Sequence, residues 1–226
     1  MRQRLEEYIK NSATKSLNER REYQMFGTID VFIKDPLPAE VDLTNIIRHL
    51  EMRIPNHLVK DVDTVYVGQF EELNIRQVQA AYLDGAIYVT NQQDNAEDMM
   101  DDLIHEFAHA AENTHGYEIY GDGQVEREFL GKRKRLFNIL KAEGYDVSLL
   151  DFIQSEHTQE MDNFLYDVVG YDKLHSLAMG LFLSPYGATS LREYWANAFE
   201  HYYMDDRQYV QQISPRVYEK LEQFTN

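Results

Sequence analysis

The character of the sequence changes at "GDG", residues 121–123, and this change limits the folds open to the chain. Before it, short runs typical of strands alternate with helical stretches. After it, apolar residues recur at helical spacing to the end of the chain. We therefore expect an α+β fold, with a mixed α/β N-terminal lobe at residues 1–120 and an α-helical C-terminal lobe at residues 121–226.

Turn-forming residues divide the chain into its expected elements. Asp84-Gly85 is a favoured tight-turn pair, and Gly144, Gly170 and Pro215 interrupt helical stretches. The expected elements are a charged helix at 2–24, a strand at 28–35, a helix at 42–53, a strand at 63–70, a hairpin at 78–91, and helices near 124–143, 147–168, 171–182, 190–206 and 214–224.

Composition excludes several classes of partner. The 226 residues include 39 acidic and 22 basic side chains, a formal charge of −17, so we expect no nucleic-acid partner. No apolar run approaches the roughly 18 residues of a membrane span, and the N-terminus lacks the apolar core of a signal peptide. We therefore expect no membrane partner and a cytoplasmic protein, with secretion or particle association by another route left open. Without cysteine, a metal must be held by His, Asp or Glu.

The segment "DDLIHEFAHAAE" contains the pattern H-E-x-x-H on an expected helix. Positions i and i+4 lie one above the other on a helix, so His105 and His109 can both turn a ring nitrogen toward one Zn²⁺ ion. Glu106 would flank that ion and take a proton from a bound water. Asp94 and Glu97 form a capping box for the helix start. The pattern predicts metallopeptidase chemistry; the alternative is two surface histidines on an ordinary helix.

Two histidines supply only two bonds, so a catalytic zinc needs a third protein ligand. One candidate is His115, because the chain reads H-E-x-x-H-x-x-E-x-x-H through it, which is similar to the metzincin pattern. Metzincins have glycine where this chain has Glu112, and a glutamate favours continuation of the helix, which would turn His115 to another face. Gly116 then offers a natural helix stop. His115 stays open as an alternative third ligand.

The second candidate lies in "SPYGATSLREYWANAFEHYY". An H-E-x-x-H, then a tyrosine, then seven residues later a glutamate that opens an E-Y/F-x-A-x-A-F helix resemble the anthrax lethal factor-like metallopeptidases. These are gluzincin-type zincins, and the Pro-Pro endopeptidases belong to the same group. The resemblance implies zinc bound by His105, His109 and Glu193, with Glu106 as general base and Tyr186 as oxyanion donor.

The local sequence allows other roles for these last residues. Ser190-Leu-Arg-Glu193 is itself a capping box, in which the glutamate reaches back to the helix start. Glu193 and Asn197 share one helix face, so Asn197 could hydrogen-bond a ligand histidine. Tyr186 follows a turn that could present it to the site, or it packs in the core as many of the 16 tyrosines would.

The resemblance covers residues 101–116 and 184–203, so the stretch 124–182 would be an insertion. We expect a two-lobed zincin-like fold and a zinc-dependent metalloendopeptidase that acts on peptide or protein substrates. The alternative is a catalytically silent zincin-fold protein that serves as a structural or binding component of a larger assembly, with the insertion contacting its partner. "AIYVT" is expected to be an edge strand that holds substrate, and "GKRKR" a solvated helix face.

Overall fold

The computed structural model describes residues 22–204 and 206–225 and has an α+β fold, which confirms the expected class. The described residues form two compact units, which we call the sheet unit and the helical unit. The sheet unit takes its residues from Met1–Met52 and Val62–Leu103, and the helical unit from Arg53–Asp61 and Ile104–Asn226. This grouping divides the chain inside the H-E-x-x-H helix, whereas the prediction kept all of that helix in the N-terminal lobe.

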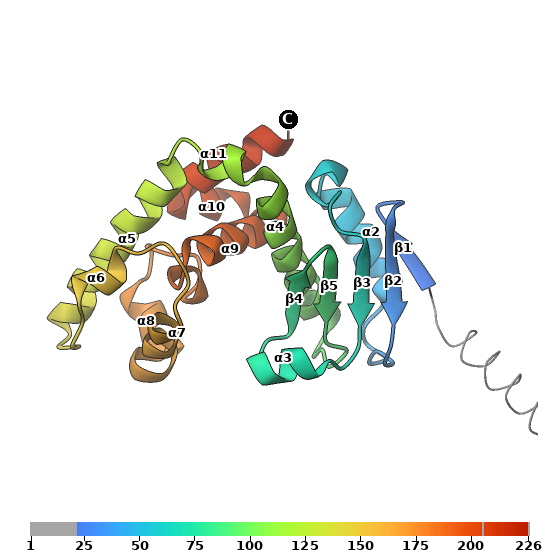
Figure 1. Ribbon diagram of the computed structural model, residues 1–226, viewed down its shortest axis with the longest axis horizontal. Helices are drawn as coiled ribbons and strands as arrows, with labels where there is room; N and C mark the ends of the chain where they lie inside the picture. The colour runs from blue at the N-terminus through green and yellow to red at the C-terminus, as the bar shows by residue number, and fades with distance from the viewer. Residues whose placement is uncertain (1–21, 205, 226) are drawn as a thin grey trace, which may run out of the picture. The chain divides into compact units, whose positions relative to one another are not determined.

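The sheet unit contains one mixed five-stranded sheet in the order β1-β2-β3-β5-β4 (Figure 1). The strands are β1 (Glu22–Met25), β2 (Ile29–Ile33), β3 (Thr64–Val67), β4 (Ala80–Leu83) and β5 (Ala86–Val89). The pairs β2–β3 and β3–β5 are parallel, whereas β1–β2 and β4–β5 are antiparallel hairpins.

Alternating burial explains the central strands. Val65 and Val67 of β3 are buried while their neighbours are partly exposed, and Ile87 and Val89 of β5 repeat that pattern. The unit also contains α2 (Leu43–Arg53) and the short α3 (Glu71–Arg76). The side chain of Asp42 accepts hydrogen bonds from the backbone N–H groups of Thr44 and Asn45 at the start of α2.

Two predictions about the edges of the sheet were wrong. Residues 22–24 belong to β1 instead of a helix, because Phe26 and Gly27 both adopt positive φ and turn the chain back into β2; residues 2–21 lie outside the described residues. The predicted edge strand "AIYVT" is β5, and it is paired on both sides. The Asp84-Gly85 turn folds β4 back along β5, so β4 occupies the edge instead.

The helix α4 (Ala96–Tyr120) carries the H-E-x-x-H pattern and belongs to both units. Its cap is Asn95 instead of the predicted Asp94, since the Asn95 side chain accepts the backbone N–H groups of Glu97 and Asp98 at 2.7 and 3.0 Å. The helix continues past the predicted stop, with a kink at His115 (φ −109°, ψ 17°) just before Gly116.

The rest of the helical unit is almost entirely helical. After the 3₁₀ turn η1 (Asn56–Leu58), its elements are α5 (Gln124–Ala142), α6 (Leu149–Phe152), α7 (Gln159–Asn163), the π-helical turn η2 (Phe164–Val169), α8 (Tyr171–Leu177), the 3₁₀ turn η3 (Tyr186–Ala188), α9 (Leu191–Tyr203), α10 (Arg207–Ile213) and α11 (Pro215–Thr225). Most of these agree with the predicted helices, but α10 was not foreseen.

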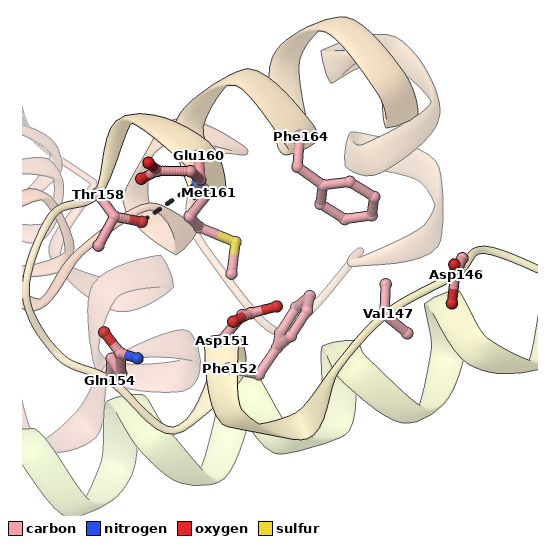
Figure 2. Close-up of a pocket in the computed structure, with 9 residues that line it drawn as sticks. All are labelled: Asp146, Val147, Asp151, Phe152, Gln154, Thr158, Glu160, Met161 and Phe164. Carbon is pink, nitrogen blue, oxygen red and sulfur yellow. Dashed lines mark hydrogen bonds between the residues drawn. The ribbon is translucent and has the colours of Figure 1, made fainter.

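The single helix predicted at 147–168 is wrong, because three short elements replace it. Ser148 and Thr158 each cap a new helix start, accepting the backbone N–H groups of Leu150 and Met161 at 3.3 and 3.2 Å; Figure 2 shows the Thr158 cap. Serine and threonine side chains compete with the helical backbone for hydrogen bonds, which favours such breaks. Among the described residues, no helix is both long and apolar enough to cross a membrane.

Candidate metal centre

Helix α4 places the two histidines of the motif on one face. The rings of His105 and His109 lie with centroids 5.0 Å apart and planes 78° apart. Apolar neighbours on the same helix, among them Ile104, Phe107 and Ala108, are fully buried and anchor it in the helical unit. The two-surface-histidine alternative is therefore disfavoured, because both imidazoles are largely buried.

Helix α9 brings the third member of the site. Its N-cap Ser190 accepts the backbone N–H of Glu193 at 3.2 Å, which is half of the predicted capping box. The Glu193 carboxylate instead faces the histidines: Oε2 lies 3.0 Å from Nε2 of His105, and Oε1 lies 3.6 Å from Nε2 of His109. The buried Trp195 donates its indole N–H to the carbonyl of Ala108 at 3.1 Å, which ties α9 to α4 between the two histidines.

The spacing of these groups fits a metal ion. One ligand atom from each of His105, His109 and Glu193 can be chosen so that all lie within 4.8 Å of one another. Bonds of about 2.0–2.1 Å in a tetrahedron place neighbouring ligand atoms about 3.3 Å apart, and the 3.0 Å between Nε2 of His105 and Oε2 of Glu193 is close to that value. Two imidazoles and a carboxylate are also a donor set that zinc accepts.

The electrostatics of the site are those of a cation pocket. Burial by itself would lower the pKa of His105, but hydrogen bonds to Glu193 and Glu200 outweigh it and raise the pKa to about 10. Burial would raise the pKa of Glu193, but the two histidines hold it well below its ordinary value. The site thus concentrates negative charge that positive charge must balance.

Two further carboxylates hold the outer nitrogens of the histidine rings. His105 donates from Nδ1 to Oε2 of Glu200 at 3.2 Å. Nδ1 of His109 lies 3.5 Å from Oε2 of Glu112, an ion-pair distance, and makes no hydrogen bond among the described residues. Such contacts fix the orientation and tautomer of a ligand histidine. The sequence prediction missed both residues. Helical spacing could have suggested them, because Glu112 follows His109 by three positions and Glu200 follows Glu193 by seven.

The predicted role of Asn197 was wrong. Its Oδ1 is buried and has no hydrogen-bond partner among the described residues. A Cβ atom on Gly187 would come within 3.0 Å of that oxygen, so Asn197 packs closely against η3. The side chain therefore shapes the turn that carries Tyr186, and Glu200 on the next turn of α9 takes the contact with His105.

Glu106 and Tyr186 lie beside the candidate centre. Glu106 is 7% exposed, and its negative charge helps to raise the pKa of the neighbouring His105. The ring of Tyr186 lies 6.1 Å from that of His105. Burial, followed by the charge of Glu193, raises the pKa of Tyr186, so its hydroxyl keeps its proton at neutral pH.

A buried arginine holds the turn between Tyr186 and Glu193. Arg133 is 1% exposed and donates from Nη1 to the carbonyls of Ala188 and Thr189 at 3.1 and 2.9 Å. The prediction of a solvated face for "GKRKR" was therefore wrong at this position. Arg133 points inward between the rings of Phe129 and Phe152, which cover its guanidinium.

His115 lies away from the candidate centre. It is not among the residues whose ligand atoms gather there, in the described part of the chain. Its ring contacts Phe224 at 5.1 Å and His57 at 6.1 Å between centroids. The kink in α4 turns the chain at this residue without bringing its ring to the other histidines, which disfavours the metzincin-like alternative.

A separate pocket of about 330 Å³ lies in the stretch predicted to be an insertion (Figure 2). Phe152, Met161 and Phe164 give it apolar walls, and exposed acidic residues stand at its edge. None of the predicted site residues lines it.

Comparisons with known proteins leave the chain without an assigned relative. No protein-family model, no curated protein and no solved structure matches it.

Proposed function

We propose that the protein is a zinc-dependent metallopeptidase of the gluzincin type, which hydrolyses internal peptide bonds. The observation that carries the proposal is the convergence of His105, His109 and Glu193, with ligand atoms within 4.8 Å of one another. These residues come from two helices and are 84 positions apart between His109 and Glu193. Glu106, the residue between the histidines that peptidase chemistry needs, stands next to them.

The remaining residues fit that chemistry. When bound, zinc would supply Lewis-acid activation of water and of the peptide carbonyl. Glu106 would accept the proton of the attacking water and pass it to the leaving amine. Tyr186, kept protonated by its raised pKa, would donate a hydrogen bond to the oxygen that gains negative charge. Glu112 and Glu200 would hold the histidines in position throughout.

The test is hydrolysis of a mixed peptide library by zinc-loaded protein, followed by mass spectrometry. Glu106→Gln keeps the shape of the side chain but removes the base, so the cleavage rate should fall by about 10²–10⁴-fold with zinc content unchanged. Glu118→Gln, an exposed position on the same helix, is the matched control and should cleave normally. A zinc-loaded protein that cleaves no peptide would overturn the proposal and favour a binding role in an assembly.

A further inference from the structure

An arginine next to the third ligand residue is held by a buried carboxylate. Arg192 occupies the second position of α9 and donates from Nε to Oε2 of Glu112 at 2.7 Å. Glu112 is 8% exposed and also accepts the hydroxyl of Tyr120 at 2.7 Å. A charge-assisted hydrogen bond to a fixed acceptor sets the direction of the planar guanidinium.

The outer edge of that guanidinium is open. The Arg192 side chain is 57% exposed, and neither Nη1 nor Nη2 makes a hydrogen bond or ion pair with any residue of 22–204 or 206–225. Arg192 is therefore a fixed cation with its free donors toward solvent.

This cation is connected to the candidate centre through Glu112. The Glu112 oxygen that accepts from Arg192 is the same Oε2 that lies 3.5 Å from Nδ1 of His109. Arg192 also directly precedes Glu193 in the chain. In a protein of charge −17, an anionic group approaching elsewhere meets repulsion, so a pre-oriented arginine here selects where such a group can be accepted.

We propose that Arg192 binds a carboxylate of the peptide substrate, with Glu112 holding its guanidinium in place. The planar fork of arginine matches a carboxylate in a bidentate arrangement. The carboxylate is either the C-terminal group of the peptide or an Asp or Glu side chain near the cleaved bond. This inference rests on the proposed function and names the chemistry of its substrate.

The experiment compares four peptides that share one parent sequence. The parent is the library member that is cleaved best or, if none is cleaved, the member that the Glu106→Gln protein retains best. The two peptides of the first pair end in a free C-terminal acid or in an amide. Both peptides of the second pair end in an amide and carry either Glu or Gln at one internal position. The readouts are kcat/KM for the wild type and binding to Glu106→Gln by fluorescence anisotropy. The wild type should prefer the acid member of one pair by about tenfold, chiefly through KM.

Substitution of Arg192 separates substrate binding from a structural role. Arg192→Met should reduce the acid/amide or Glu/Gln ratio to about one, and Arg192→Lys should keep part of it, since a lysine retains charge without the fork. Arg216→Met, which removes an exposed arginine of an ion pair with Glu219, should keep the full ratio. A role limited to positioning His109 would lower both members of a pair equally.

Each outcome decides between the two proposals. Cleavage by the wild type without preference within either pair overturns the role of Arg192 and leaves the peptidase proposal standing. A preference that survives in Arg192→Met also overturns it. If no peptide is cleaved but Glu106→Gln binds acid members better and loses this on Arg192→Met, the carboxylate site stands while the peptidase proposal fails. If the protein neither cleaves nor binds any of the peptides, both proposals are overturned.

Discussion

The two compact units differ in what they bury. In the described part of the sheet unit, the buried polar residues are neutral, namely Thr90, Asn91 and Gln93. The described part of the helical unit, by contrast, buries four charged residues: Glu106, Glu112, Arg133 and Lys220. Burying charge costs several kcal/mol unless specific partners compensate.

The contacts of the buried charges show what the helical unit gains. Three of them converge on the segments that carry the candidate centre: Glu106 and Glu112 lie on the motif helix, and Arg133 holds the turn before α9. The described part of the sheet unit buries no charged side chain, and backbone hydrogen bonds between its strands accompany its apolar packing. Among the described residues, three of the four buried charges therefore belong to or hold the segments of the candidate site, whereas Lys220 binds Glu118 and Asp122 instead.

The largest expected effect is on zinc binding, and its absence would mean that the buried charges of the helical unit do not surround a metal site. Glu193→Gln should weaken zinc binding by about a thousandfold, if one of three protein ligands carries a third of the roughly 10–16 kcal/mol typical of structural zinc. His115→Ala should leave the affinity unchanged, because its ring lies with Phe224 and His57. The dissociation constants are measured by competition with a chromophoric chelator, and a reversed result would restore the metzincin-like alternative.

The second effect concerns stability. Arg133→Met leaves the carbonyls of Ala188 and Thr189 without their buried donor, so the free energy of unfolding should fall by about 3 kcal/mol. Arg135→Met, at an exposed position of the same helix, should change it by less than about 0.5 kcal/mol. Urea denaturation provides both values. Equal effects in the two variants would mean that the burial of Arg133 contributes nothing.

The third effect sharpens the role of the outer carboxylates. Glu200→Gln weakens the hold on His105, and Glu112→Gln does the same for His109, so each should weaken zinc binding by about 10–100-fold. Glu219→Gln, in an exposed ion pair, serves as the control. Zinc dissociation constants and the visible spectrum of the Co²⁺-substituted protein report on affinity and geometry. Unchanged values in both variants would show that these carboxylates do not contribute to zinc binding.

The smallest effect is a pH dependence. Burial lowers the pKa of Lys132 from 10.5 to about 8. Between these values the unfolded chain keeps a proton that the folded protein has released, so this residue makes stability rise with pH. The rise from pH 7 to pH 9 should be about 1 kcal/mol larger in the wild type than in Lys132→Met. Lys134→Met, on the exposed side of α5, should follow the wild type in urea titrations at each pH.

Local pattern was enough for most elements of both units. Alternation predicted β2, β3 and the β4–β5 hairpin, and helical spacing predicted α2, α5, α9 and α11. It failed where polar side chains intervene, as at Ser148 and Thr158, because the choice between a continuing helix and a new cap depends on which hydrogen bond the packed chain permits. Local pattern also could not predict the order of the strands, and therefore did not show that β5 lies inside the sheet.

The residues of the candidate site likewise fall into those that local pattern predicts and those that it does not. The spacing of His105, Glu106 and His109 follows from the periodicity of one helix, which the sequence contains in full. Glu193 comes from far along the chain, and no helical period links it to position 109, so the sequence suggested it only through the family resemblance.

Residue spacing was enough to predict an α+β chain whose motif helix can present two histidines to a cation. The packed structure was needed to choose between Glu193 and His115 as their partner, and to show that Glu200 and Glu112 face their outer nitrogens in place of Asn197. The physical reason is that helix periodicity is a local property, whereas the contact of α9 with α4 depends on packing such as that of Trp195 on Ala108.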